Sequence, residues 1–241
     1  MRNNIIIVFL IVLCIFSYNL NAKSINESVI LLHGLGDVKL SMLKLESALK
    51  EEGYTTKNIG YSTTGETIES LAEKELSEVV ERYKKIGFKK IHFVTHSMGG
   101  LIVRYYLQDH TLPTGSRIVM LSPPNHGSEV ADHFLESKFY KLIVGEVGQE
   151  LATDSKMLLE LKQIIPDVGI IAGNKSSNSY FSKMIPGEDD GRVAVDNTKL
   201  TEMKDFIVVP STHLTIKYNS EVIKQTVFFI KTGKFKHIEK E

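Results

Sequence analysis

The stretch IHFVTHSMGGLIVRYYLQ, residues 91–108, joins an apolar run to a helical pattern through a turn that carries Ser97. Residues 91–95 predict a buried strand, and residues 98–108 predict a helix. A serine at the apex of such a turn is exposed above a parallel sheet, and the positive end of the helix points at it. The stretch therefore predicts a nucleophilic serine; an ordinary glycine-rich strand–helix turn is the alternative.

The rest of the chain alternates in the same way between apolar runs and helical patterns. This alternation predicts an α/β fold with a mostly parallel sheet and helices on both faces. Ligands of such sheets bind beyond the carboxyl ends of the strands, where the loops 33–37, 96–99, 122–128, 188–192 and 211–214 would meet. Further strands are predicted at 28–32, 56–61, 117–121, 168–172 and 206–209, and helices from about 42 to Gly53, at 67–86 and from Ser220 to Gly233.

A serine nucleophile needs a base and a group that orients the base. His213 follows the last strand-like run and is the predicted base, while His126 is the competing histidine. Within the acidic run 188–190 we predict Asp190 as the acid because it directly precedes a glycine, and Asp189 remains an alternative. The order Ser, Asp, His matches one known arrangement of such triads, whereas His126 would break that order.

Two backbone N–H groups are needed to stabilise the oxyanion of an acyl-transfer reaction. The first is predicted at Met98, the residue after the nucleophile. The second is predicted at Leu35, in the loop that begins with His33 and Gly34. Gly99 gives the serine turn the room it needs.

Four motifs in this order resemble the lipase-like α/β-hydrolases, in particular small bacterial triacylglycerol lipases and deacylases that act on lipid anchors. The motifs are HGLG at 33–36, THSMGG at 95–100, PNHGS at 124–128 and DGRV at 190–193, and the resemblance extends over residues 28–232. It implies the same triad and oxyanion donors. Thr95 departs from the family's usual glycine. The chain also begins at what would be the third strand of larger members, which implies a reduced sheet.

The first 22 residues have the pattern of a secretory signal. Arg2 precedes the apolar run from Ile5 to Phe16, and a polar stretch ends at Ala22. We expect a secreted or periplasmic protein, or alternatively one anchored to a membrane by the uncleaved segment. Residues 23–241 are predicted to form a single domain.

Composition excludes some partners and suggests others. Twenty-nine basic and 29 acidic residues leave no positive excess for nucleic acid, and the eight histidines are scattered, so neither a metal nor a cofactor is expected. Residues 129–165 are predicted to form an apolar cap over the substrate pocket, with a plain surface helix as the alternative. The apolar residues on which this prediction rests are Val130, Phe134, Phe139, Tyr140, Leu142, Ile143 and Val144.

Together these features predict a hydrolase of carboxylic esters, including lipid esters, that works through an acyl-enzyme on Ser97 and contacts a membrane surface. An acyltransferase or thioesterase with the same triad is one alternative. A catalytically silent binding module on the same fold is another. The sequence leaves the oligomeric state open.

Overall fold

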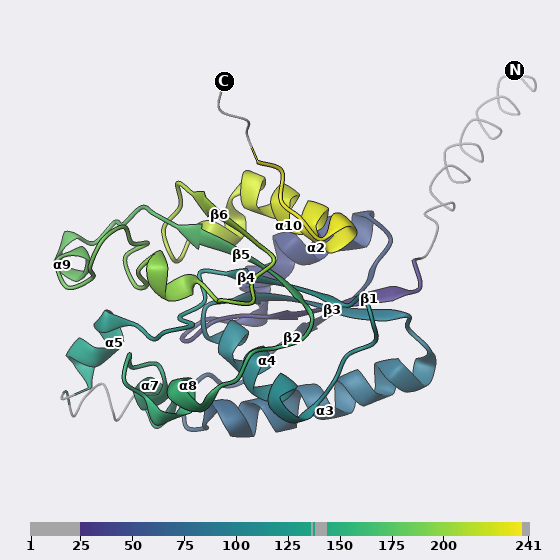
Figure 1. Ribbon diagram of the computed structural model, residues 1–241, viewed down its shortest axis with the longest axis horizontal. Helices are drawn as coiled ribbons and strands as arrows, with labels where there is room; N and C mark the ends of the chain where they lie inside the picture. Colours follow the sequence, from purple (N-terminus) through teal and green to yellow (C-terminus); the bar gives the residue numbers. More distant parts are fainter. Residues whose placement is uncertain (1–24, 136, 138–143, 238–241) are drawn as a thin grey trace, which may run out of the picture.

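Six parallel strands form one sheet in the computed structural model, which describes residues 25–135, 137 and 144–237 (Figure 1). The strand order is β2-β1-β3-β4-β5-β6, which confirms the predicted α/β fold class. The predicted signal at residues 1–22 lies outside the described residues. The strands are β1 (Glu27–Leu32), β2 (Thr55–Ile59), β3 (Lys90–His96), β4 (Arg117–Leu121), β5 (Asp167–Gly173) and β6 (Asp205–Val209).

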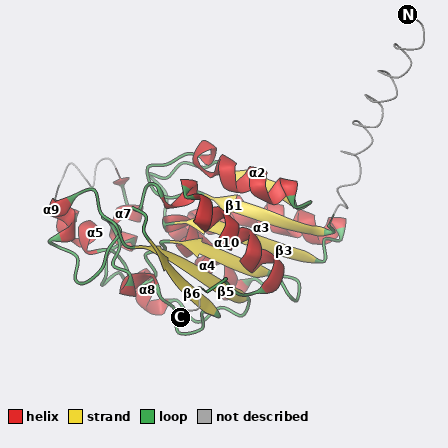
Figure 2. Cartoon of the chain, turned by 90° about the horizontal axis from the view of Figure 1, so that it is seen from above, coloured by secondary structure: helices red, strands yellow, loops and turns green. Residues whose placement is uncertain are grey.

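Four longer helices cover the two faces of the sheet (Figures 1 and 2). Alternate residues of each strand point to opposite faces. Val29 and Leu31 of β1 therefore pack in the core under α2 (Leu43–Glu51) and α10 (Ser220–Thr232). Ile30 and Leu32 pack in the other core, under α3 (Ile68–Ile86) and α4 (Met98–Asp109). Burial on both faces explains why the inner strands β1, β3, β4 and β5 are mostly apolar, whereas the edge strand β2, with the sequence TTKNI, is not.

The ends of the long helices follow from local sequence. The Thr67 hydroxyl accepts a hydrogen bond from the Ser70 N–H and caps α3, which ends where Gly87 adopts a φ of 91°. Asn219 caps α10 in the same way, and Gly233 at φ 79° ends that helix. Only glycine adopts this left-handed conformation without a steric cost. The helix expected from residue 42 instead starts at Leu43, after the 3₁₀ turn η1 (Lys39–Met42).

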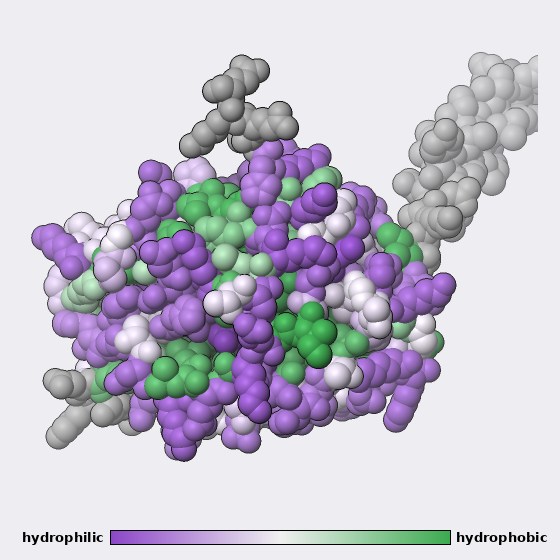
Figure 3. Space-filling model, in the orientation of Figure 1, coloured by the Kyte–Doolittle hydropathy of each residue, from purple (hydrophilic) through white to green (hydrophobic). Residues whose placement is uncertain are grey.

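Short helices gather beyond the carboxyl ends of the strands (Figures 1 and 2). The predicted cap at 129–165 holds three of them among its described residues, and four of its expected apolar residues, Phe139, Tyr140, Leu142 and Ile143, lie outside that part of the chain. Hydrophilic residues dominate the face seen in Figure 3, with apolar side chains in separate patches. The short elements are α5 (Glu129–Phe134), α7 (Val147–Glu150), α8 (Lys156–Glu160), α9 (Ser179–Ser182), η2 (Asp196–Thr198) and η3 (Ile216–Tyr218).

The register of the strands brings their last residues to a common edge. Leu32 of β1 lies beside Thr95 of β3, and His96 lies beside Leu121 of β4. Leu121 in turn lies beside Ile171 of β5. The loops that follow these residues therefore start side by side, as the parallel arrangement predicts. Within the described ranges, no helix combines the length and apolar content that crossing a membrane requires.

Candidate active site

Ser97 occupies the sharp turn between β3 and α4. Its backbone has a φ of 53° and a ψ of −127°, a combination rarely adopted by residues other than glycine. The Ser97 N–H donates to the Leu121 carbonyl oxygen at 2.9 Å, so the neighbouring strand holds the turn. The side chain thus lies beyond the strand end, at the N-terminus of α4.

Two glycines leave the space that this turn occupies. A Cβ on Gly34 would lie 2.8 Å from the Ser97 Cβ. A Cβ on Gly99 would lie 2.9 Å from the carbonyl oxygens of both Leu32 and His33. Side chains do not pack this closely, so glycine at both positions is a steric requirement of the close approach between the β1 loop and the serine turn.

The structure brings His213 to Ser97. The Ser97 hydroxyl lies 2.9 Å from His213 Nε2, and the two residues are only 8% and 5% exposed. The loop carrying the histidine is fixed twice: its N–H donates to the Asp190 carbonyl, and its own carbonyl accepts from the His96 ring, both at 2.8 Å. His126, the competing histidine, is exposed, and its backbone N–H donates to the Asn197 carbonyl oxygen.

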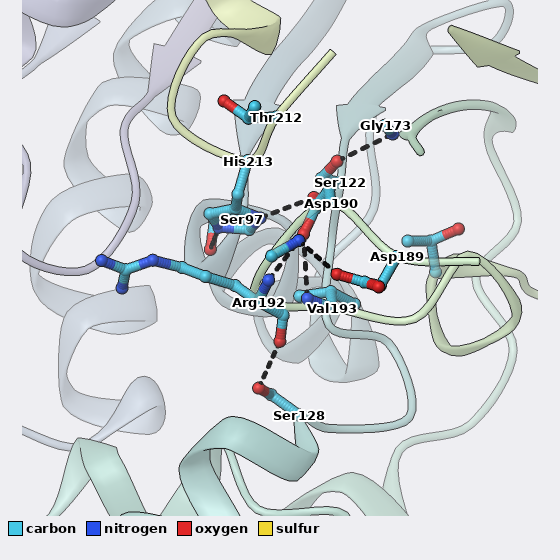
Figure 4. A network of polar contacts seen from close by, with 12 residues as sticks. Ser97, Ser122, Ser128, Gly173, Asp189, Asp190, Arg192, Val193, Thr212 and His213 are labelled. Carbon is cyan, nitrogen blue, oxygen red and sulfur yellow. Dashed lines mark hydrogen bonds and ion pairs between the residues drawn. The ribbon is translucent and has the colours of Figure 1, made fainter. Parts of the chain in front are cut away.

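Asp190 lies on the other side of the His213 ring (Figure 4). Its Oδ2 accepts from His213 Nδ1 at 2.8 Å, and its Oδ1 accepts from the N–H groups of Arg192 and Val193 at 3.0 and 2.9 Å. Burial would raise the pKa of this carboxyl, but the electrostatic interaction with His213 in its protonated form and hydrogen bonds from His213, Ser122 and Val193 together outweigh it, so the pKa is lowered. A carboxylate at this place orients the ring and stabilises its protonated form.

The neighbouring acids have other partners. Asp189 accepts from the Ser182 hydroxyl at 2.9 Å and from the Gly191 N–H at 2.7 Å, which stabilises the turn itself. Glu188 is exposed and accepts from the Asn174 side chain. Of the acidic run 188–190, only Asp190 contacts His213 among the described residues.

The loop after β1 is held by an aromatic stack. The ring of His33 lies 4.2 Å from the ring of Tyr61 and nearly parallel to it, and the Tyr61 hydroxyl donates to the His33 carbonyl. Burial lowers the pKa of His33, which favours the neutral ring found in this stack. Leu35, two residues on, lies against the cavity next to Ser97. The Met98 N–H is the first of α4 and has no acceptor within the helix by position.

Thr95, the departure from the usual glycine, fits without disturbing the turn. It is fully buried at the end of β3, and its Oγ1 lies 3.4 Å from the place of a Cβ on Gly100. That hydroxyl has no hydrogen-bond partner among the described residues. The methyl group fills space, and the hydroxyl remains unpaired.

A cavity of about 400 Å³ opens beside Ser97. One wall is apolar and is formed by α5, α9 and the residues around α7. Val130, Phe134 and Val144 of the predicted cap lie in this wall. The other apolar wall residues are Ala131, Leu151 and Phe181.

Four residues around the triad were not predicted from the sequence. Ser122 donates to Asp190 and accepts from the Gly173 N–H, and Tyr61 holds the His33 loop. Lys217 and Asp37 form an ion pair at the cavity wall. Asp37 directly follows the HGLG motif and could have been noticed there; the other three carry no pattern. No three His, Cys, Asp or Glu side chains of the described part of the chain are grouped to hold a metal ion.

Comparison with known proteins agrees with this fold. A lipase from Bacillus licheniformis, BlEst2 in its mature form, superposes with a TM-score of 0.63 at 17% identity, covering 86% of this chain and 91% of that one. The lin2722 gene product of Listeria innocua superposes with a TM-score of 0.60 at 21% identity, covering 88% of this chain and 96% of that one. The metagenomic carboxyl esterase MGS0156 superposes with a TM-score of 0.62 at 15% identity, covering 80% of this chain and 66% of that one.

A family model described as the alpha/beta hydrolase fold matches residues 27–164, more than half of the chain. The match spans β1 and its loop, the Ser97 turn and the predicted cap. Family and neighbours together support a hydrolase. The chain belongs to the α/β-hydrolase fold family.

Proposed function

We propose that this protein hydrolyses carboxylic esters through an acyl-enzyme on Ser97. The observation that carries the proposal is the unbroken hydrogen-bonded chain from Ser97 through His213 to Asp190, with heavy-atom distances of 2.9 and 2.8 Å. Because Asp190 accepts from Nδ1, the neutral ring carries its proton there, and Nε2 is free to accept the serine proton.

The reaction follows from this arrangement. Ser97 Oγ attacks the ester carbonyl carbon while its proton passes to His213 Nε2, and the N–H groups of Met98 and Leu35 stabilise the oxyanion. The intermediate collapses, the C–O bond breaks, and His213 returns the proton to the departing alcohol. Water then attacks the acyl-enzyme with His213 again as base, which releases the acid and restores Ser97.

We further propose that the acyl chain occupies the apolar wall of the cavity. Val130, Phe134 and Phe181 present hydrocarbon surface there, which favours burial of an alkyl chain. This supports lipid esters as substrates, with residues 129–165 acting as a cap. Replacing Phe134 with Ala should lower activity on long acyl chains more than on acetate esters.

The test is hydrolysis of p-nitrophenyl esters with acyl chains from short to long. Ser97→Ala should abolish turnover and labelling by a fluorophosphonate, while Ser62→Ala, an exposed serine between β2 and α3, should retain both. Turnover that survives in Ser97→Ala would contradict the proposal. Labelling without hydrolysis, with acyl transfer to added alcohols or thiols, would favour an acyltransferase. Neither labelling nor turnover would leave a silent module.

A further inference from the structure

The cavity is lined by few charged side chains, and positive charges outnumber negative ones. Of the described residues that line it, only Asp37, Arg192 and Lys217 carry charged side chains besides the histidines. The Lys217 ammonium lies 2.6 Å from an Asp37 carboxylate oxygen, so these two charges neutralise each other. Arg192 is left as an uncompensated positive charge.

The backbone of Arg192 is fixed close to the triad. Its N–H donates to Asp190 Oδ1 at 3.0 Å, and its carbonyl accepts from the Ser128 hydroxyl at 2.6 Å. Figure 4 shows its side chain extending away from Asp190, on the side where the Ser97 hydroxyl lies. These two hydrogen bonds therefore fix the position of the Arg192 backbone relative to Asp190.

Arg192 is exposed, and within the part of the chain that the structure describes its guanidinium has neither a hydrogen bond nor an ion pair. Its planar set of donors matches the oxygens of a phosphate or a carboxylate. A guanidinium at the wall of a reactive cavity, without an acidic partner, is available to a ligand.

The apolar wall of the cavity restricts where a negatively charged group of the substrate can bind. The wall formed by Val130, Phe134 and Phe181 would desolvate an ionic group without pairing it, at a high cost in free energy. We infer that Arg192 recognises a negatively charged group on the alcohol side of the ester. The preferred substrates are thus anionic amphiphiles: an apolar acyl chain esterified to an alcohol that bears a phosphate or a carboxylate. This inference rests on the proposed ester hydrolysis.

The experiment compares pairs of esters that share the acyl chain and the scissile ester, one member neutral and the other anionic. One pair is 1-decanoylglycerol and its 3-phosphate; the other is the methyl ester of O-decanoyl-lactate and the free acid, all used as monomers. The wild type should prefer the anionic member. Arg192→Gln should lower the ratio of kcat/KM for the anionic member to kcat/KM for the neutral member about tenfold, equal to about 1.4 kcal/mol. Arg192→Lys should retain part of the preference, because a point charge remains.

The matched control is Arg82→Gln, an exposed arginine on α3 that does not line the cavity, which should keep the wild-type ratio. A larger effect in the phosphate pair would indicate a phosphorylated headgroup; a larger effect in the carboxylate pair would indicate a hydroxy-acid ester. Equal losses on both members of a pair, or no change in Arg192→Gln, would overturn the inference.

A binding measurement separates this inference from the proposed reaction. In Ser97→Ala protein, calorimetry should show decyl phosphate binding more tightly than decanol, and adding Arg192→Gln should remove the difference. Decyl phosphate affinity that is independent of Arg192 would refute anion recognition even if hydrolysis is confirmed. Conversely, an Arg192-dependent affinity in a protein without esterase activity would refute only the proposed reaction.

Discussion

Lys217 and Asp37 connect two loops of the site through an ion pair at 2.6 Å, with the Lys217 side chain only 3% exposed. Lys217 follows the base His213 by four residues, and Asp37 follows the predicted oxyanion donor Leu35 by two. Burial would raise the pKa of Asp37, but the hydrogen bonds from Lys217 and the Val38 N–H and the charge of Lys217 act together with smaller effects to lower it. The pair therefore holds the base loop and the oxyanion loop in a common position.

Breaking this pair should destabilise the protein and slow catalysis. Lys217→Met leaves the Asp37 carboxylate without its partner, and removing one member of a buried pair costs about 3–5 kcal/mol. Since the Asp37 side chain is 19% exposed, we expect a loss at or just below the lower limit of this range, about 2–3 kcal/mol, in urea unfolding. kcat should fall with it, because Leu35 loses its anchor.

The double variant Asp37→Leu/Lys217→Met should recover much of the lost stability, because no unpaired charge remains. Lys199→Met, which breaks the exposed pair with Asp196, should change stability by less than about 1 kcal/mol. Strictly additive losses in the double variant would show that the two residues are not coupled.

Gly34→Ala should impair catalysis more than folding. The new Cβ would meet the Ser97 Cβ at 2.8 Å and His96 Nδ1 at 3.1 Å, so the nucleophile must shift. A displacement of this size can cost about 10²-fold in kcat. Gly60→Ala is the control, since its Cβ would meet only the flexible Lys39 side chain. Equal activities of the two variants would contradict a steric role for Gly34.

The fold was predictable because most strands are short apolar runs that alternate with helical patterns, which predicts a parallel sheet with helices on both faces. Ser97 and His213 are 116 residues apart, yet both lie just beyond strand ends that the parallel arrangement brings together. Asp190 was favoured over Asp189 through its neighbouring glycine, and the hydrogen bonds of the two carboxylates explain the difference.

What the sequence could not show are contacts that depend on side-chain packing across the fold. Lys217 and Asp37 are 180 residues apart and have no periodic pattern. Tyr61 follows a weak edge strand, and nothing in its surroundings suggests that it stacks on His33. Ser122 resembles any serine after a strand until the register places it beside Asp190.

Thr95→Val should stabilise the protein. The Thr95 hydroxyl is buried without a partner among the described residues, and burying an unpaired polar group costs about 1–3 kcal/mol. Valine keeps the shape and removes this cost, so the free energy of unfolding should rise by about 1 kcal/mol, with activity unchanged. Thr95→Gly, which restores the more usual residue, should instead lose stability through the cavity it leaves. A destabilised valine variant would show that the hydroxyl has a partner.

His92 should make stability depend on pH. Its Nδ1 accepts from the Arg117 N–H and its Nε2 donates to Glu27, both at 3.0 Å, so the buried ring is neutral. Burial is the main cause that lowers its pKa to about 4, from 6.5 for a free histidine. Between these values the unfolded chain binds more protons than the folded one, so stability rises with pH.

The contribution of His92 is therefore fully present above pH 6.5, about 3 kcal/mol, and is lost as the pH falls to about 4. His92→Gln removes the titrating ring, so the variant should be less stable than wild type at pH 7.5 and approach it on acidification. Urea unfolding at several pH values measures this difference. His126→Gln, at an exposed histidine, should track wild type throughout. A difference in the free energy of unfolding between wild type and His92→Gln that stays constant from pH 7.5 to 4.5 would mean that the His92 ring has the same pKa in the folded and unfolded states.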